Sequence, residues 1–228
     1  KNEDISFITE RKETISKGYQ ALWTEEGFKS EDAKKPDDRA NALAVLSGLA
    51  EKEQYETIKN VLTTTQNSSP YMEYYVLEAL CKMGEYEAAK DRIKDRYEGM
   101  MSEDYSTLWE FWDSWRGTKN HAWSGGGLTI LSQYIAGIEP IKPQFELFRV
   151  CPNLATLNRV KSVVPTVFGN IELSVDKSDN LLNITLIVPA GTTAKVVVPQ
   201  GYNTLVCGDS KGAELTLTQG KYSITAIK

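Results

Sequence analysis

The spacing of apolar residues changes once along the chain, near residues 138–140, and this change constrains the fold more than any other feature. Before it, apolar side chains recur every three or four residues, which predicts amphipathic helices. After it, apolar and polar residues alternate in short runs punctuated by prolines, which is typical of strands that bury one face. The sequence therefore predicts two domains, a helical one over residues 1–138 and a β domain over residues 139–228.

Start and stop signals divide the first part into helices. A first helix with a largely apolar face is expected over about residues 3–26, because Gly27 supplies a C-terminal stop. Ser69-Pro70 predicts another start, since a hydroxyl N-cap precedes proline at the first helical position. Gly84 ends that helix and a return helix follows at once, which predicts a hairpin of two helices. Further helices are expected after a cap at Asp37 or Asp38, over residues 52–65 and over residues 124–136.

Two expectations concern the faces of these helices. Residues 90–96 (KDRIKDR) mix both signs of charge at helical spacing, which is typical of a solvated face with surface ion pairs. In the helix over residues 124–136, the side chains of Leu128, Leu131 and Ile135 are expected to point inward, followed by Ile138.

The β part consists of short alternating segments. Asp179-Asn180 and residues 190–192 (AGT) are turn signals between them. About ninety residues of such strands predict an antiparallel β-sandwich. The side chains expected to point inward are Ile171, Leu173, Val175, Leu182, Ile184, Leu186, Val188, Val196, Val198, Leu215, Leu217, Tyr222 and Ile224.

Composition excludes several classes of partner. The net charge is −5 and no Lys/Arg face is clustered, which argues against nucleic acid as a partner. No run of eighteen apolar residues exists, so no membrane span is expected. Cys81, Cys151 and Cys207 are widely spaced and only one histidine is present, which predicts three small buried side chains and no metal site. The sequence contains no phosphate-cradling glycine motif, so no organic cofactor is expected. The sequence begins at Lys1 without a charged-then-apolar leader, which predicts an internal start.

Residues 106–127 contain four of the five tryptophans, the only histidine and three consecutive glycines. This mixture predicts a shaped loop between helices. A carboxylate among indole rings is one way to hold a sugar, because the apolar face of the sugar stacks on the ring while the acid accepts hydrogen bonds. Trp109, Trp112 and Trp115 also recur every three residues, so a core stripe on a helix is the alternative.

Several runs resemble one enzyme family along nearly the whole chain. They resemble the C-terminal part of bacterial α-L-rhamnosidases, inverting glycoside hydrolases with an (α/α)6 barrel followed by a β-sandwich. The resemblance implies antiparallel helical hairpins that form half of this barrel over residues 1–138, and the sandwich over residues 139–228. The matching runs are residues 41–49 (NALAVLSGL), 69–80 (SPYMEYYVLEAL), 107–110 (TLWE), 120–125 (NHAWSG), 131–140 (LSQYIAGIEP) and 189–199 (PAGTTAKVVVP).

The resemblance also implies roles for single residues. Glu110 matches the carboxylate that acts as general base on water, and His121 matches a histidine that hydrogen-bonds the bound sugar. Trp109, Trp112 and Trp123 are expected as walls of the sugar site, from their neighbourhood and not from a matched motif. The partner implied is a rhamnose-containing oligosaccharide or glycoside. A glycan-degrading enzyme of this kind is expected in the periplasm or outside the cell.

The chain departs from the family pattern in two ways. Family members usually carry Gly-Pro where this chain has Gly126-Gly127. The acidic motif that supplies the general acid has no counterpart, whereas inverting hydrolysis needs two carboxyl groups roughly 6.5–9.5 Å apart. We therefore expect the chain alone to be inactive and to lack the N-terminal half of its barrel. Helix faces that this half would cover are expected to cause self-association.

Two other classes of function remain open from the residues alone. One is a carbohydrate-binding module without catalysis, which would use the same aromatic side chains. The other is an α-helical scaffold, since helix starts near residues 38 and 70 are about 32 residues apart, close to the period of helix-pair repeats. A scaffold gives no reason for the tryptophan-rich loop. The aglycone and the linkage are not indicated.

Overall fold

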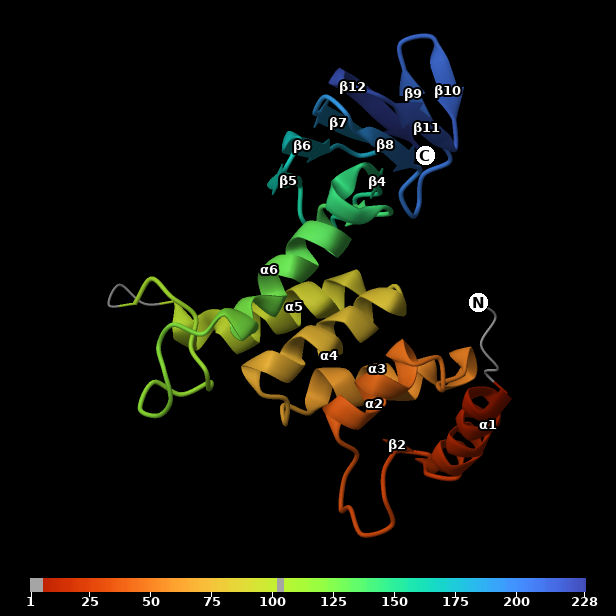
Figure 1. Cartoon of the computed structure of the whole chain (residues 1–228), viewed down its shortest axis with the longest axis vertical. Helices are drawn as coiled ribbons and strands as arrows, with labels where there is room; N and C mark the ends of the chain where they lie inside the picture. The colour runs from red at the N-terminus through yellow and green to blue at the C-terminus, as the bar shows by residue number, and fades with distance from the viewer. Residues whose placement is uncertain (1–5, 102–104) are drawn as a thin grey trace. The chain divides into compact units, whose positions relative to one another are not determined.

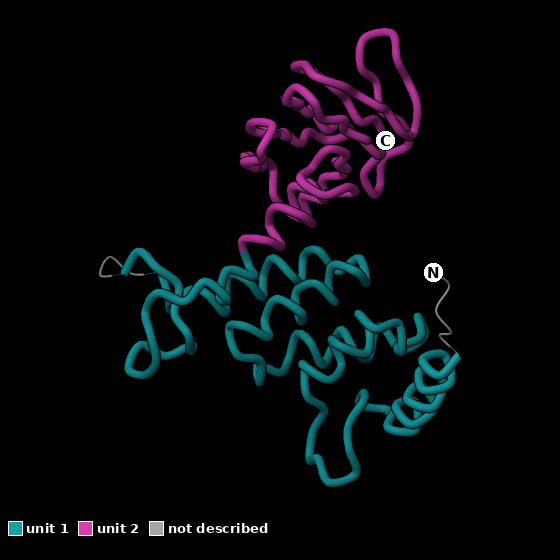
Figure 2. Tube along the Cα trace, viewed as in Figure 1, with its two compact units in different colours: residues 1–127 teal, residues 128–228 magenta. Residues whose placement is uncertain are grey.

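The computed structural model describes residues 6–101 and 105–228. The chain forms helices first and then β-strands, as the sequence predicted (Figure 1). It divides into two compact units, residues 1–127 and 128–228 (Figure 2). None of the helices in the described ranges is long and apolar enough to cross a bilayer. Six α-helices occur in these ranges: α1 (Ser6–Gln20), α2 (Asp38–Leu46), α3 (Tyr55–Thr64), α4 (Pro70–Lys82), α5 (Tyr86–Tyr97) and α6 (Gly126–Ile130).

The local start signals of the helical unit act as predicted. Asp37 caps α2 by accepting from the backbone of Arg39, and the hydroxyl of Ser69 caps α4 by accepting from the backbone of Met72. α4 and α5 follow each other across a short turn and lie side by side in Figure 1. The packing of α2, α3 and α4 buries small and branched side chains, which lets α2 approach α4 closely. The fully buried ones are Ala42, Ala44, Ile58, Leu62, Val76, Leu77, Ala79 and Leu80.

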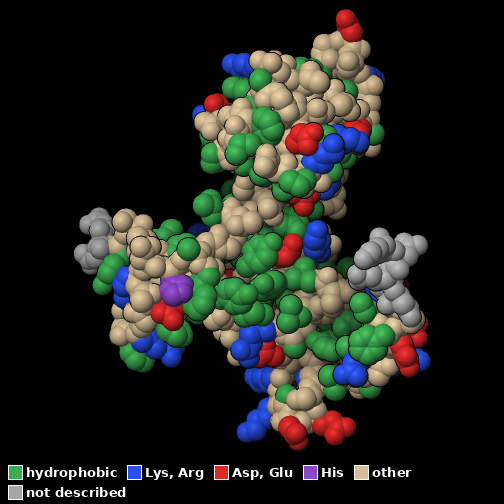
Figure 3. All heavy atoms as spheres, in the orientation of Figure 1, with side chains coloured by type: hydrophobic (Ala, Val, Ile, Leu, Met, Phe, Trp, Pro, Cys, Tyr) green, Lys and Arg blue, Asp and Glu red, His purple; other side chains and the backbone are tan. Residues whose placement is uncertain are grey.

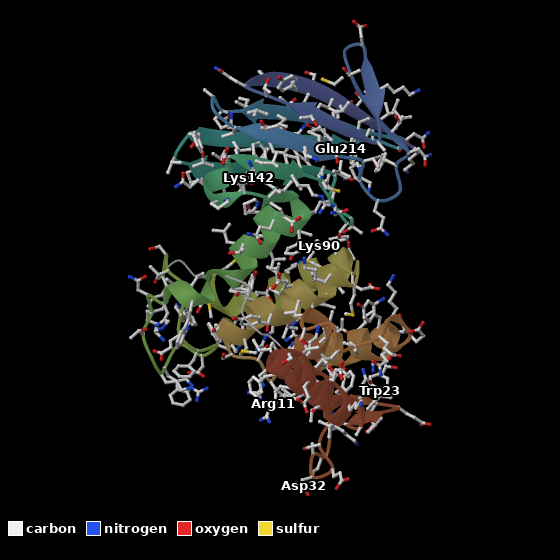
Figure 4. All side chains as sticks on the ribbon, turned by 45° about the vertical axis from the view of Figure 1, so that its right-hand side comes forward. Arg11, Trp23, Asp32, Lys90, Lys142 and Glu214 are labelled. Atoms are coloured by element: carbon white, nitrogen blue, oxygen red, sulfur yellow. The ribbon has the colours of Figure 1, made fainter. Side chains whose placement is uncertain are left out.

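The expected end of the first helix is wrong, and residues 3–5 of its expected range lie outside the described residues. α1 ends at Gln20, and β1 (Trp23–Thr24) pairs with β2 (Gly27–Phe28) where the helix was expected to continue. Gly27 has φ +123°, a conformation that a helix cannot contain. None of the side chains of α1 is fully buried, and Phe7, Ile8 and Ile15 are exposed, although Tyr19 packs on Phe28. Arg11, labelled in Figure 4, belongs to this exposed helix.

The expectation that residues 90–96 form a solvated face holds only in part: Asp91, Lys94 and Asp95 are exposed, whereas Arg92 is buried and Arg96 is partly buried. Arg92 on α5 pairs with Asp38 on α2 (Nη2 to Oδ2, 2.7 Å) and with Glu73 on α4 (Nε to Oε1, 2.6 Å). Arg96 lies 3.5 Å from the Glu73 carboxylate, and the hydroxyl of Ser68 donates to the same carboxylate. Two carboxylates thus balance two guanidinium groups inside the helical unit. We call these four charged residues and Ser68 the ionic cluster.

The second unit begins inside α6. The following turn, η4 (Leu131–Ile135), is a π-helix in which the backbone N–H of Ala136 donates to the carbonyl of Leu131 (2.8 Å). Ile130 and Ile135 are buried, whereas Leu128 is 73% exposed, so the expectation that Leu128 points inward is wrong. The wider π turn shifts the helical spacing that this expectation used.

Gly137 connects this turn to the first strand at a close approach of two backbones. It has φ +75°, and a Cβ built on it would lie 2.0 Å from the carbonyl oxygen of Cys151. The backbone N–H of Cys151 donates to the carbonyl of Gly137 (2.9 Å). Only glycine fits this position without a backbone shift.

The strands of the second unit form two sheets. One has the order β10-β9-β12-β7-β6-β5 and the other has the order β11-β8-β4-β3. Side chains of both sheets contribute to one apolar core, which contains Ile171, Ile184, Leu186, Phe148 and Val196. The strands are β3 (Ile138–Pro140), β4 (Leu147–Val150), β5 (Arg159–Thr166), β6 (Gly169–Lys177), β7 (Leu181–Val188), β8 (Thr193–Val197), β9 (Thr204–Cys207), β10 (Ser210–Gly212), β11 (Glu214–Leu217) and β12 (Gly220–Ile227).

The directions of the strands are mixed, which corrects the expectation of a wholly antiparallel β domain. β4 and β8 pair in parallel, with Phe148 opposite Ala194 and Val150 opposite Val196. The other pairs are antiparallel among the strands that the structure describes, and the turns at Asp179-Asn180 and Gly191 lie where the sequence predicted them. Glu214 on β11, labelled in Figure 4, pairs with Lys195 on β8 (3.2 Å).

Candidate sugar site on the aromatic loop

The tryptophan-rich loop within residues 106–127, called the aromatic loop from here on, folds back on itself and brings Glu110 beside His121. The backbone N–H of Glu110 donates to the carbonyl of Thr118 (3.0 Å), and that of His121 donates to the carbonyl of Leu108 (2.9 Å). The hydroxyl of Thr107 donates to the carbonyl of Lys119. This short ladder joins the two runs that the sequence singled out. The backbone therefore holds residues 107–110 next to residues 118–121.

Thr118 links the carboxylate and the imidazole. Glu110 Oε2 accepts from the backbone N–H of Thr118 (3.0 Å) and from its hydroxyl (3.3 Å). The same hydroxyl oxygen lies 2.6 Å from Nδ1 of His121, and Nδ1 lies 3.8 Å from Glu110 Oε2. If the hydroxyl donates to Glu110, its oxygen accepts from Nδ1, so Nδ1 carries a proton and Nε2 is free to bind a ligand.

Both side chains remain accessible to a ligand. The side chain of Glu110 is 24% exposed and that of His121 is 27% exposed. No residue in the described ranges donates a hydrogen bond to Glu110 Oε1. Figure 3 shows the histidine, drawn in purple, at the surface with an acidic side chain next to it. One carboxylate oxygen is thus fixed by the protein, and the other can accept from water.

Gly117 allows this arrangement. It has φ +68°, and a Cβ built on it would lie 2.6 Å from the ring of Phe111 and 2.9 Å from Glu110 Oε2. A larger residue would displace the carboxylate. Sequence reasoning did not assign roles to Gly117 and Thr118, although a Gly-Thr pair after an aromatic run is a turn signal that pointed to them.

The tryptophans of the loop have different environments. Trp109 is 4% exposed, and its ring contacts Tyr105 (centroids 5.4 Å apart) and the ammonium group of Lys119 (4.8 Å). Trp115 is exposed at the surface. The segment that carries these residues is not helical, so the tryptophans form no stripe on a helix, although Trp109 is buried as the core alternative predicted.

Trp112 is tied to the helical unit. Its indole N–H donates to the carbonyl of Ser68 (2.8 Å), and its ring meets the edge of Tyr97 (5.1 Å). The guanidinium group of Arg96 lies over the same ring at 4.2 Å and also donates to the Ser68 carbonyl (2.6 Å). Trp112 thus attaches the loop to the ionic cluster.

Trp123 is the tryptophan whose ring lies beside His121. Its ring centroid is 4.1 Å from that of His121, and 47% of the residue is exposed. It belongs to the 3-10 turn η3 (Ala122–Gly125), which contacts α4. The structure therefore brings Glu110, His121 and Trp123 together, while Trp109 and Trp112 support the loop from its inner side.

The described residues form no cluster of metal-binding side chains. No group of three or more His, Cys, Asp or Glu side chains that could hold a metal ion occurs in the described ranges. The expectation of three buried cysteines is wrong for Cys207, which is partly exposed, and correct for Cys81 and Cys151. Burial raises the pKa of Cys81 to about 12 and also raises that of Cys151. At neutral pH these groups are uncharged side chains of the core.

Comparisons with known proteins show which folds this chain resembles. The family model for the bacterial alpha-L-rhamnosidase C-terminal domain matches residues 137–213. No curated protein sequence matches the chain. The fold is similar to the α-L-rhamnosidase from Dictyoglumus thermophilum, with a TM-score of 0.78 and 18% identity over 97% of this chain and 29% of that chain.

Two further solved structures are similar over most of this chain. The Streptomyces avermitilis α-L-rhamnosidase complexed with L-rhamnose has a TM-score of 0.72 and 18% identity, covering 98% of this chain and 24% of that chain. The native enzyme from Aspergillus terreus has a TM-score of 0.69 and 17% identity, covering 98% and 28%. This chain thus spans less than a third of the length of these enzymes. By its fold and by the match over residues 137–213, the chain is similar to the C-terminal part of bacterial α-L-rhamnosidases, as its sequence motifs predicted.

Proposed function

We propose that this chain is the C-terminal part of an α-L-rhamnosidase that hydrolyses terminal α-L-rhamnosyl groups with inversion. In this proposal residues 1–138 form half of an (α/α)6 barrel and residues 139–228 form a β-sandwich. The main support is one observation: the carboxylate of Glu110, held by Thr118, lies 3.8 Å from His121 beside an open indole ring.

Glu110 is the general base of this proposal. As a water molecule attacks the anomeric carbon, Glu110 Oε1 takes one of its protons, and the bond to the leaving oxygen breaks on the opposite face of the sugar. The leaving oxygen takes its proton from an acid outside the chain. His121 would use Nε2 to hydrogen-bond a sugar hydroxyl, because Nδ1 faces Thr118.

The tryptophans have two different roles in this proposal. The exposed ring of Trp123 would stack on the apolar face of the sugar. Trp109 and Trp112, which we expected as walls of the site, would instead shape it by holding the loop that carries Glu110.

The chain by itself should hydrolyse nothing detectable. General acid catalysis contributes about 10²–10⁴-fold, and the resemblance places the acid in a part of the barrel that this sequence does not contain. Turnover of an aryl α-L-rhamnoside by the 228-residue chain, lost in Glu110→Gln, would contradict the prediction of inactivity while supporting Glu110 as the base.

Binding of L-rhamnose tests the site directly. Titration followed by NMR should show weak saturable binding to the 228-residue chain. His121→Ala should weaken it about tenfold, the effect of losing one hydrogen bond worth about 1.4 kcal/mol. The control is Glu56→Gln, which changes an exposed carboxylate far from the loop in sequence and should leave affinity unchanged. Equal affinity in His121→Ala would contradict the proposed site.

The same titration tests the other classes of function. The exposed aromatic ring beside His121 also suits a carbohydrate-binding module, which would bind rhamnose fully in this chain alone, whereas an enzyme fragment should bind it weakly and more tightly once the missing half of the barrel is supplied. A helical scaffold would ignore rhamnose altogether.

A further inference from the structure

We propose that a second ring-binding subsite, formed by Tyr71 and Tyr75 on α4, adjoins the sugar site. It would bind the group attached to the rhamnosyl unit, a six-membered ring with a flat apolar face. This inference rests on the proposed function and extends it to the neighbouring part of the substrate.

The aromatic side chains form a continuous row that starts at the carboxylate. His121 lies beside Glu110, and the ring of Trp123 follows at 4.1 Å. The ring of Tyr71 lies 5.6 Å from that of Trp123, and the ring of Tyr75 lies 5.8 Å from that of Tyr71. Trp123 is the ring that the proposed function assigns to the rhamnosyl unit, so Tyr71 and Tyr75 are left for a neighbouring group.

The rings of Tyr71 and Tyr75 are not among the fully buried side chains of α4. Tyr71 is 44% exposed, and Tyr71 and Tyr75 are four residues apart, so they share one face of α4. The buried face of α4 consists of other residues, including Val76, Leu77 and Leu80. Figure 3 shows hydrophobic side chains that continue from the histidine across the helices. An exposed row of large aromatic side chains is typical of a binding surface.

The row also offers polar groups. The hydroxyl groups of Tyr71 and Tyr75 lie 3.3 Å apart and hydrogen-bond each other. A phenol oxygen that takes part in one hydrogen bond can still interact with another partner. The subsite could therefore stack on the face of a ring and bind one of its hydroxyl groups.

The backbone holds the two parts of the row in contact. Gly126 follows η3, and a Cβ built on it would lie 2.7 Å from Cβ of Tyr74. This close approach seats η3 against α4, so Trp123 and Tyr71 meet.

The group on the leaving side is the part of the substrate that extends past the sugar. In an inverting displacement the water attacks on one face of the sugar and the leaving oxygen departs from the other, so the group attached to that oxygen points away from the general base. His121 and Trp123 separate Tyr71 and Tyr75 from Glu110 along the row, and a ring bound there would therefore belong to this group.

The test compares three ligands on the full 228-residue chain: methyl α-L-rhamnoside, phenyl α-L-rhamnoside and a rhamnosyl-glucose disaccharide. We expect one or both of the larger ligands to bind several-fold more tightly than the methyl glycoside, as one aromatic contact predicts. Tyr71→Ala should remove this gain without changing the affinity for the methyl glycoside. Tyr71→Phe, which keeps the ring, should retain most of it. The control Trp115→Ala removes an exposed aromatic ring that lies on the aromatic loop but outside the row, and it should leave the affinity for all three ligands unchanged.

The outcomes distinguish the two proposals. A gain for the disaccharide assigns a sugar to the subsite, and a gain for the phenyl glycoside assigns an aryl group. If the methyl glycoside binds but a second ring adds nothing, or if Tyr71→Ala keeps the gain, the subsite is contradicted and the rhamnose site stands. If none of the three ligands binds, both proposals fail.

Discussion

Glu73 is fully buried, and its neutralisation depends on arginines from α5. Burial by itself would lower the pKa of Arg92, but the hydrogen bond to Glu73 and the charges of Glu73 and Asp38 outweigh it and raise the pKa. Burial lowers the pKa of Arg96, which has weaker contacts. Arg92 is therefore the firmly ionised centre of the ionic cluster.

Glu73→Gln should destabilise the helical unit by about 3–5 kcal/mol, because it leaves one guanidinium group buried without a balancing charge. Urea unfolding followed by tryptophan fluorescence would measure this, since all five tryptophans lie in residues 1–127. The matched control is Glu56→Gln, which breaks an exposed pair with Lys59 (4.0 Å) in the same unit and should cost much less. Equal effects would show that the cluster does not stabilise the fold.

The sequence predicted single residues well where the signal was local. Asp37 and Ser69 cap helices because capping needs only the next few residues. The burial of Arg92 could not be predicted, since its two acidic partners come from distant helices. The meeting of Glu110 with His121 was implied by the family resemblance, but the bridging role of Thr118 depends on how the loop folds back.

Whole elements were predicted where they start and less well where they end. The start of α4 and the short turn to α5 were correct because proline and glycine define them. The end of α1 was missed because the β1–β2 hairpin forms around Gly27. The parallel pairing of β4 with β8 could not be predicted, because alternation of apolar residues indicates a strand but not its direction.

The contact of η3 with α4 depends on a glycine, and two adjacent glycines allow a matched test. Gly126→Ala should lower stability by about 1–3 kcal/mol, because the new methyl group meets Tyr74. Gly125→Ala should have little effect, since a Cβ there meets nothing within 4 Å. Urea unfolding of both variants checks the difference. A cost in Gly125→Ala as large as in Gly126→Ala would contradict the contact.

On the scale of the whole molecule, the chain spans 24–29% of the length of the similar solved enzymes. In the described part of the chain, α1 buries none of its side chains. A hollow of about 410 Å³ lies along it, lined by Phe7, Ile8, Ile15 and Leu49 among others. Such an apolar surface favours association with another chain.

We expect the 228-residue chain to self-associate through this surface. Replacing Ile8 and Ile15 with Asp should shift sedimentation toward the monomer, because charges in an apolar contact are costly. The control double variant Glu13→Gln, Lys17→Gln changes exposed polar positions of the same helix and should associate like the parent. A parent chain that sediments as a monomer at all concentrations would contradict the prediction.

The carbonyl of Ser68 accepts from Arg96 and from Trp112, so one peptide group joins the charged interior to the loop that carries Glu110. Under the proposed function, a mutation deep among the helices should weaken sugar binding as well as lower the melting temperature. Variants that bind poorly should then be sought in the helical interior as well as at the loop.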